Sequence, residues 1–279
     1  MQRKNEKKYY VLVPLPSSDR KRCLPQPNCP YIKENVCKDG SLDVDIFNKM
    51  LSDGKTLLSR LQSKQERNNF VHSEIITFED TAILQNLTKD DVLYVTAHGS
   101  ASEIGSYKEG VDIAPRQLAE NFKKSNLSKE LTIIKIMACD SAVDEHSIDK
   151  SYPKDTDKAK PTLEKFEKRQ KNINSSLYLC GKSSVNHYLP SYAQRFQLIM
   201  QGNKGENGYT NLNVYGYLGE VSDQDKSKKN RDKHTYVYSG NGLYVRAKDA
   251  RIRFFPANTN DEEKNEIRDT NRNNINLMS

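Results

Sequence analysis

Short apolar runs alternate along the chain with segments in which apolar residues recur every three or four positions. The runs predict β-strands, and the spacing of three and four predicts amphipathic helices. The predicted strands are residues 9–13, 75–78, 92–97, 131–138, 177–180, 212–218, 235–238, 243–246 and 251–255. The predicted helices are residues 41–61, 113–122 and 192–201.

Two of these strands, 92–97 and 131–138, are almost entirely apolar, which is typical of strands buried on both faces of a parallel sheet. The helix between them completes a strand–helix–strand crossover unit. We therefore expect an α/β fold with a mostly parallel central sheet flanked by helices. Further along, the turn residues 239–242 predict a β-hairpin between the strands 235–238 and 243–246.

The composition of the chain changes at two places. Residues 143–175 are rich in Lys and Asp and contain two prolines, so we expect a solvated insertion there. Residues 257–279 are polar and have little to bury, so we expect a disordered tail. The predicted strands and helices fit a single domain, residues 1–256, in this chain of 279 residues.

Composition also excludes several classes of protein. No run of about 18 apolar residues is present, so we expect no membrane-spanning helix. The charged start of the chain is followed only by a short apolar run, so we expect no Sec signal peptide. Five cysteines are an odd and modest number, which indicates reduced thiols rather than a disulfide framework. Cys23, Cys29 and Cys37 lack the paired spacing of a zinc site, so we expect no metal.

Two reactive side chains directly follow the two buried strands: His98 the first and Cys139 the second. In an open parallel α/β sheet, catalytic groups lie beyond the carboxyl ends of the strands. An imidazole within hydrogen-bond reach of a cysteine helps to generate the nucleophilic thiolate and can protonate a leaving amine. His98 and Cys139 are therefore a candidate catalytic dyad. The N–H groups of Gly99 and Cys139 are candidates for holding the developing oxyanion.

Structural explanations of the same residues stay open. A cysteine that closes a buried strand is often only a small apolar residue, and a histidine at a strand end is often a satisfied polar group. Cys180 also follows an apolar run, but no other histidine directly ends a long buried strand to pair with it. Glu79 and Asp80 follow their own strand and are candidates for orienting His98, for helix capping or for solvent-facing roles.

A His-Gly pair after one hydrophobic strand, followed by a cysteine after the next, resembles the caspase-like clan of cysteine peptidases. The closer resemblance is to the inositol hexakisphosphate-activated cysteine protease domain of RTX-type and large clostridial toxins. Residues 111–122, 192–201 and 211–214 are similar to elements of that family in the same order. The resemblance covers roughly residues 90–142 and 190–255.

This resemblance implies a caspase-like fold and a catalytic pair in which Cys139 is the nucleophile and His98 the general acid and base. The segment around the nucleophile differs from the family. Residues 137–141 read Met-Ala-Cys-Asp-Ser, whereas the toxin domains usually have Gly-Cys-Ser. The substrate pocket is therefore expected to differ near Asp140.

Between Ser222 and Arg253, nine Lys and Arg stand against four Asp. Such a charge run is often only a solvated face, but on a hairpin it can also form a pocket for a polyphosphate. The resemblance implies that residues 226–253 are the family's basic β-flap. The activator contacts that it implies are Lys233, Arg246 and Arg251, with Lys229, Arg231 and Lys248 as neighbours. Tyr215 and Asp232 stand where the family tends to have arginine.

The function that the resemblance implies is that of a cysteine endopeptidase, activated by inositol hexakisphosphate, which cleaves itself or a host protein. A free-standing relative without a Sec signal implies a bacterial effector or toxin, secreted by a non-Sec route and acting in the host cytosol. Two alternatives stay open: a Cys-His acyltransferase or deamidase of the same fold, and a non-enzymatic module that binds polyanions. The absence of a nucleic-acid motif argues against nucleic acid as the partner.

Overall fold

The computed structural model describes residues 7–14, 51–62, 72–99, 103–106, 111–143, 190–202, 208–222, 236–238, 244–256 and 258–278. Several predictions lie outside these residues. They are Cys23, Cys29, Cys37, the strand 177–180, nearly all of the insertion 143–175, and the basic residues Lys229, Arg231 and Lys233.

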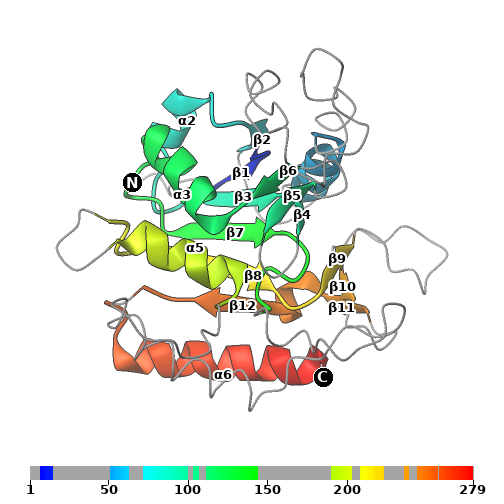
Figure 1. The fold of residues 1–279 in the computed structure, drawn as a ribbon. Helices are drawn as coiled ribbons and strands as arrows, with labels where there is room; N and C mark the ends of the chain where they lie inside the picture. The colour runs from blue at the N-terminus through cyan, green and yellow to red at the C-terminus, as the bar shows by residue number, and fades with distance from the viewer. Residues whose placement is uncertain are drawn as a thin grey trace, which may run out of the picture.

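The centre of the molecule is a six-stranded sheet in the order β12-β8-β7-β3-β1-β2 (Figure 1). Its neighbouring strands are parallel except for β12, which pairs antiparallel with β8. The strands are β1 (Lys8–Leu12), β2 (His72–Ile76), β3 (Val92–Thr96), β7 (Ile133–Met137), β8 (Asn213–Tyr217) and β12 (Arg251–Phe254). The prediction of a mostly parallel central sheet is confirmed, and β3 is buried along its whole length, as its apolar sequence predicts.

Two helices, α3 (Pro115–Lys124) and α5 (Tyr192–Gln201), pack against each other on one face of the sheet. The rings of Phe122 and Phe196 lie 5.8 Å apart between these helices, and Phe122 also meets Phe78 edge-on at 5.1 Å. Proline opens α3, and the hydroxyl of Ser191 accepts a hydrogen bond from Gln194 N at the start of α5. The prediction of both helices is confirmed.

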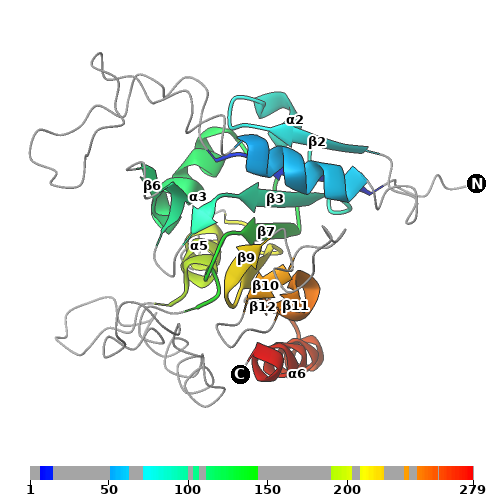
Figure 2. The ribbon, with the colours of Figure 1, turned by 90° about the vertical axis from the view of Figure 1, so that its right-hand side faces the viewer.

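A further helix, residues 51–62, covers the other face. A Cβ added at Gly54 would lie 3.2 Å from a methyl of Val13 and 3.6 Å from that of Thr96, so the helix backbone runs close above β1 and β3. Figure 2 shows this helix, in blue, lying across the same strands. The pairing of Tyr94 with Lys135, and of Lys135 with Tyr215, places these three side chains on the face that this helix covers.

Two small sheets flank the central one. The first has the order β4-β5-β6 and the second the order β11-β10-β9. Their strands are β4 (His98–Gly99), β5 (Ile104–Ser106), β6 (Val111–Ile113), β9 (Glu220–Ser222), β10 (Tyr236–Tyr238) and β11 (Tyr244–Arg246). Strands β10 and β11 pair antiparallel, with Tyr238 opposite Tyr244. The chain also forms α2 (Thr81–Gln85) and the 3-10 helix η3 (Ala247–Asp249).

The predicted disordered tail, residues 257–279, is wrong for most of its length. Residues Asp261–Met278 form α6, which runs beside β12 (Figure 1, red). Three acidic residues in its first turn stabilise the helix through their interaction with its dipole. The side chain of Asn260 also accepts a hydrogen bond from Glu263 N at 2.8 Å. Where its side chains are described, the helix contacts β12 mainly through polar groups, which the composition of the segment does not reveal.

Within the parts of the chain that the structure describes, no helix is both long and apolar enough to cross a membrane.

Candidate active site

His98 and Cys139 meet at the carboxyl edge of the central sheet. His98 opens β4 just after β3, and Cys139 lies in the turn just after β7. Because β3 and β7 are adjacent and parallel, their carboxyl ends lie side by side, and Ala97 N still donates to Met137 O at 3.5 Å. Both residues line one pocket of about 260 Å³, which we call the strand-end pocket. The structure therefore brings the two predicted catalytic residues together.

Gly99 lies against the backbone that carries Cys139. A Cβ added at position 99 would lie 2.6 Å from Ala138 Cβ, 2.8 Å from Cys139 O and 3.1 Å from Cys139 N. The first two separations are shorter than van der Waals contact allows, and one of them is to backbone. Only glycine fits here without a shift of the strand ends, so Gly99 sets the spacing between the histidine and cysteine segments.

The turn that carries Cys139 is fastened to the end of β8. Asp140, the next residue, has a φ of 54°, in the left-handed region that residues other than glycine seldom adopt. Its N–H donates to Gly219 O at 3.0 Å, and Ala142 N donates to Tyr217 O at 2.9 Å. These two bonds hold a strained turn in place immediately after the candidate nucleophile.

Ser141 is fully buried and joins this turn to three elements. Its hydroxyl donates to Ile136 O at 3.0 Å and accepts from Tyr217 N at 3.0 Å, while its carbonyl accepts from Ala193 N at 2.9 Å. In the sequence, Ser141 stands out only as part of the segment around the candidate nucleophile. Its structural role depends on partners 5, 52 and 76 positions away along the chain, which a local motif does not show.

Asp53, which sequence analysis did not single out, lies next to His98. The carboxylate Oδ2 of Asp53 lies 3.6 Å from His98 Nε2, and the two side chains are 51% and 41% exposed. Nε2 itself is buried and makes no hydrogen bond within the described part of the chain. Asp53 comes from the helix 51–62, so the histidine is approached by an acid from the face opposite to α3 and α5.

Asp80 and Glu79, the two acids that the sequence offers for orienting His98, have local or solvent-facing positions in the structure. Asp80 Oδ2 accepts hydrogen bonds from Thr77 N at 2.7 Å and Thr77 Oγ1 at 3.1 Å, which closes the turn before α2. Asp80 stands at the N-cap position of α2, although its side chain makes no cap hydrogen bond there. Glu79 is exposed. Asp80 therefore has a local structural role.

The walls of the strand-end pocket are mixed in character. Leu57, Ala97, Met137 and Val221 supply apolar surface, and the polar lining is Asp53, Thr56, Arg60 and Thr96. Val221 belongs to β9, so the small β9–β11 sheet forms part of the wall beside Cys139. In that sheet Val237, which is fully buried, is opposite Val221 on one side and Val245 on the other.

The predicted activator residues that the structure describes lie on different elements. Arg246 is exposed at the end of β11, and Lys248 is exposed in η3, where its Nζ lies 3.4 Å from Asp249 Oδ1. Arg251 belongs to β12 of the central sheet, and its guanidinium lies 5.0 Å from the centre of the Tyr215 ring. The strand β11 and the start of β12 are joined only by η3, so the three cations lie on a short stretch of chain.

One further cation, Lys135, lies on the same face of the central sheet. Its Nζ donates to Tyr94 Oη at 3.1 Å and lies 5.8 Å from the centre of the Tyr215 ring. Tyr215 therefore has Lys135 and Arg251 as neighbours, which is an arrangement that favours cation–π attraction. Burial raises the pKa of Tyr217 to about 12, against the opposite effect of the Arg251 cation.

A larger cavity of about 640 Å³ lies at the opposite end of the strands, where Leu127 and Tyr209 line it. Its described lining contains neither cysteine nor histidine, so the strand-end pocket is the better candidate for catalysis. Among the residues with described positions, no three His, Cys, Asp or Glu side chains gather as metal ligands.

Comparison with known proteins adds no relative: no family model matches the chain, and no curated protein matches it.

Proposed function

We propose that the protein is a cysteine endopeptidase in which Cys139 is the nucleophile and His98 the general acid and base. The observation that carries the proposal is that both side chains line one pocket at the carboxyl ends of adjacent parallel strands. That edge is where open α/β sheets bind substrates and place catalytic groups. The order of these residues along the chain resembles the toxin protease domains, which supports the same assignment.

In the proposed reaction, the Cys139 thiolate attacks the carbonyl carbon of the scissile peptide bond, and a carbon–sulfur bond forms. The resulting oxyanion collapses, the carbon–nitrogen bond breaks, and His98 gives a proton to the leaving amine. Water then attacks the thioester with His98 as the base, which releases the carboxylate product and regenerates the thiol.

Asp53 supports the role of His98. A carboxylate 3.6 Å from Nε2 restrains the orientation of the imidazole ring. With Nε2 directed to Asp53, Nδ1 is the nitrogen that serves the thiol. The pair is about half exposed, so its contribution is to orientation more than to folding stability.

The oxyanion is held by backbone N–H groups in this proposal. The close approach of Gly99 to Cys139 N places the backbone of the histidine segment beside that of the nucleophile. Two N–H groups, those of Gly99 and Cys139, are then the candidate donors to the tetrahedral intermediate. The bonds of Asp140 and Ala142 to the end of β8 keep this backbone in one conformation.

Inositol hexakisphosphate is the proposed activator. The predicted contacts Arg246, Lys248 and Arg251, with Lys229, Arg231 and Lys233 as further cations, belong to the basic segment that includes β10 and β11. Strand β9 pairs with β10 and contributes Val221 to the strand-end pocket. Binding of a polyanion to the basic segment would therefore act on the wall beside Cys139 through two strand pairings, and so shift the population toward an aligned cleft.

Because this activator is a metabolite of eukaryotic cells, the proposed place of action is the host cytosol. We extend the proposal to a bacterial effector or toxin with itself or a host protein as substrate.

The proposal is tested with a peptide library and the purified protein, with and without inositol hexakisphosphate, and with mass spectrometry of the products. Cleaved peptides whose new ends gain one water, formed only with the activator and lost in Cys139→Ala, are expected. Cys180→Ala is the matched control and should keep activity. A gain of one mass unit without cleavage, or an acyl adduct, would contradict peptide hydrolysis in favour of deamidation or acyl transfer.

A further inference from the structure

Among the described strands, β12 is the last at one side of the central sheet, and one side of its backbone has no partner among them. In an antiparallel pair, alternate residues direct their N–H and C=O groups to opposite sides of the strand. Arg251 and Arg253 are the alternate residues whose backbone groups face away from β8, because α6 binds them there. An open row of such groups is a template for pairing with another strand.

Two asparagines of α6 occupy this edge. The side chain of Asn271 accepts from Arg253 N at 2.9 Å and donates to Arg253 O at 3.0 Å. Asn274 donates to Arg251 O at 2.7 Å. Both asparagines are only 7% exposed, and their spacing of three places them on one side of the helix. A carboxamide carries N–H donors and a carbonyl acceptor side by side, so Asn271 reproduces the pair of bonds that a neighbouring strand would make.

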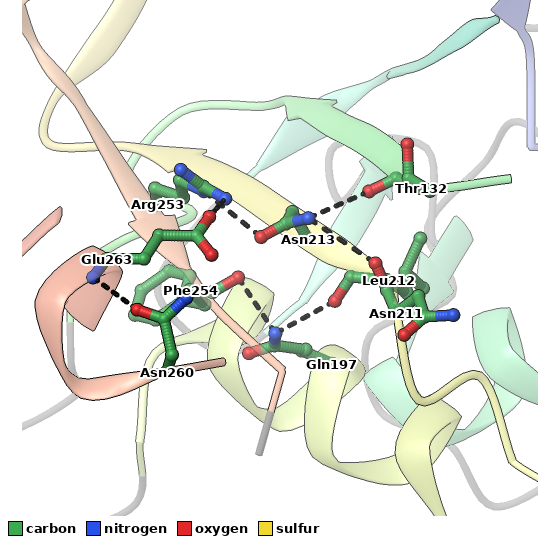
Figure 3. Close-up of polar contacts among 9 residues, drawn as sticks. All are labelled: Thr132, Gln197, Asn211, Leu212, Asn213, Arg253, Phe254, Asn260 and Glu263. Atoms are coloured by element: carbon green, nitrogen blue, oxygen red, sulfur yellow. Dashed lines mark hydrogen bonds and ion pairs between the residues drawn. The ribbon is translucent and has the colours of Figure 1, made fainter. Parts of the chain in front are cut away.

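The start of α6 is tied to the same strand through Arg253 (Figure 3). The guanidinium donates to Glu263 Oε1 at 2.6 Å and to Asn213 Oδ1 at 3.0 Å. Asn213 in turn donates to Thr132 O at 3.2 Å, which continues the contacts to the chain just before β7. On the inner side, Gln197 of α5 donates to Phe254 O at 2.8 Å, so both sides of β12 receive side-chain amides.

Apolar packing of α6 is slight where its side chains are described. Between residues 261 and 274, Ile267 is the one buried apolar side chain. Ile267, Asn271 and Asn274 follow each other at intervals of four and three, so a single stripe of the helix faces the sheet. Over residues 261–274, the contacts that fix this helix are therefore mostly those that satisfy the edge of β12.

We infer that α6 is an edge cover: its asparagines occupy the outer backbone groups of β12 and so keep the sheet from pairing with β12 of a second copy of this chain. The charged residues of this edge also predict how pairing depends on salt. In an antiparallel pair of two β12 strands, Arg251 and Arg253 would face each other, and like charges opposite one another oppose pairing. In the folded chain, Glu263 neutralises Arg253. Pairing of uncovered edges therefore strengthens as salt screens the arginines.

The test uses the full chain with Asn271→Ala and Asn274→Ala combined, and Asn273→Ala, an exposed asparagine of the same helix, as the control. Sedimentation velocity is expected to show a monomer for the wild type and the control. It is expected to show a dimer for the double variant at high protein concentration, with a larger dimer fraction at high salt.

Hydrogen exchange of the single variant tests the same contacts if the double variant folds poorly. In Asn271→Ala alone, exchange of the Arg253 amide should rise about tenfold in dilute solution, because one hydrogen bond is lost. Unchanged exchange of that amide would overturn the inference. A fast-exchanging Arg253 amide in a protein that stays monomeric at both salt concentrations would overturn it too.

Discussion

Gly99 and Cys139 touch through their backbones: a Cβ on residue 99 would lie 2.8 Å from the carbonyl oxygen of Cys139. The contact joins the segment after β3 to the segment after β7 at the point where the proposed chemistry occurs. The spacing of His98 and Cys139 therefore depends on a position without a side chain.

Gly99→Ala is expected to lower kcat by about 10²-fold or more, because the added methyl group must push the two strand ends apart and displacements of about 1 Å have that effect. Gly54→Ala is the control, since its nearest contact is a side-chain methyl of Val13 at 3.2 Å and not the backbone. Peptide cleavage assays on both variants check this. Full activity of Gly99→Ala would show that the contact does not set the catalytic geometry.

Asp53→Asn is expected to lower kcat by about tenfold with little change in KM. The amide keeps the shape of the side chain but loses the charge beside His98 Nε2. The expected loss is smaller than the whole contribution of general acid–base catalysis, because His98 itself remains. Thermal unfolding should change little because the pair is about half exposed. Asp80→Asn, on the turn before α2, is the comparison and should keep the wild-type kcat. A wild-type pH–rate profile and kcat for Asp53→Asn would remove Asp53 from the mechanism.

Ser141→Ala is expected to destabilise the protein by about 2–4 kcal/mol, because it leaves Tyr217 N–H and Ile136 C=O buried without this hydroxyl. Urea unfolding measures the change. Ser125→Ala removes a single buried bond, to Phe78 O, and should cost about 1–2 kcal/mol without loss of activity. Equal effects of the two variants on stability and activity would argue against a special role for the turn after Cys139.

Stability is expected to fall as the pH rises from about 10 to about 12, because burial raises the pKa of Tyr217 to about 12 in the folded protein. The unfolded chain releases this proton near pH 10 and the folded protein only near 12, so alkaline solution favours unfolding in that window. The loss attributable to Tyr217 is about 3 kcal/mol, from roughly two pKa units. Tyr217→Phe should show a correspondingly smaller loss in urea unfolding between these pH values, and an unchanged loss would contradict the assignment.

Arg251→Ala and Arg246→Ala are each expected to raise the inositol hexakisphosphate concentration for half-maximal activity about 10- to 100-fold, since a charge-assisted contact contributes about 1.5–3 kcal/mol. Lys124→Ala, an exposed cation at the end of α3, is the control. An equal response to the activator in all three variants would show that these arginines do not take part in activation.

The parts of the fold that sequence predicts well are those with a local signature. Strands β3 and β7 are almost entirely apolar, and α5 has a clear apolar period, so these elements were predicted close to their observed bounds. Their order also placed His98 and Cys139 at neighbouring strand ends. The small strands β4, β5 and β9 have two or three residues each, too few for a period to be visible.

Two features of the site depend on distant parts of the chain and have no local signature. Asp53 reaches His98 only because the helix 51–62 crosses the face of β1 and β3. The prediction for the C-terminal segment failed for a related reason. Composition indicates disorder, whereas hydrogen bonds from Asn271 and Asn274 to the backbone of β12 stabilise the helix. The spacing of Ile267, Asn271 and Asn274, together with the acidic first turn of α6, was the available signal.

The most direct test of the central claim is the labelling of Cys139 by a peptide bearing a thiol-reactive electrophile, located by mass spectrometry. The account predicts rapid labelling of Cys139 in the presence of inositol hexakisphosphate, slow labelling without it, and slow labelling of His98→Ala under both conditions. Labelling of Cys139 at the same slow rate in all of these samples would contradict an activated Cys139–His98 dyad.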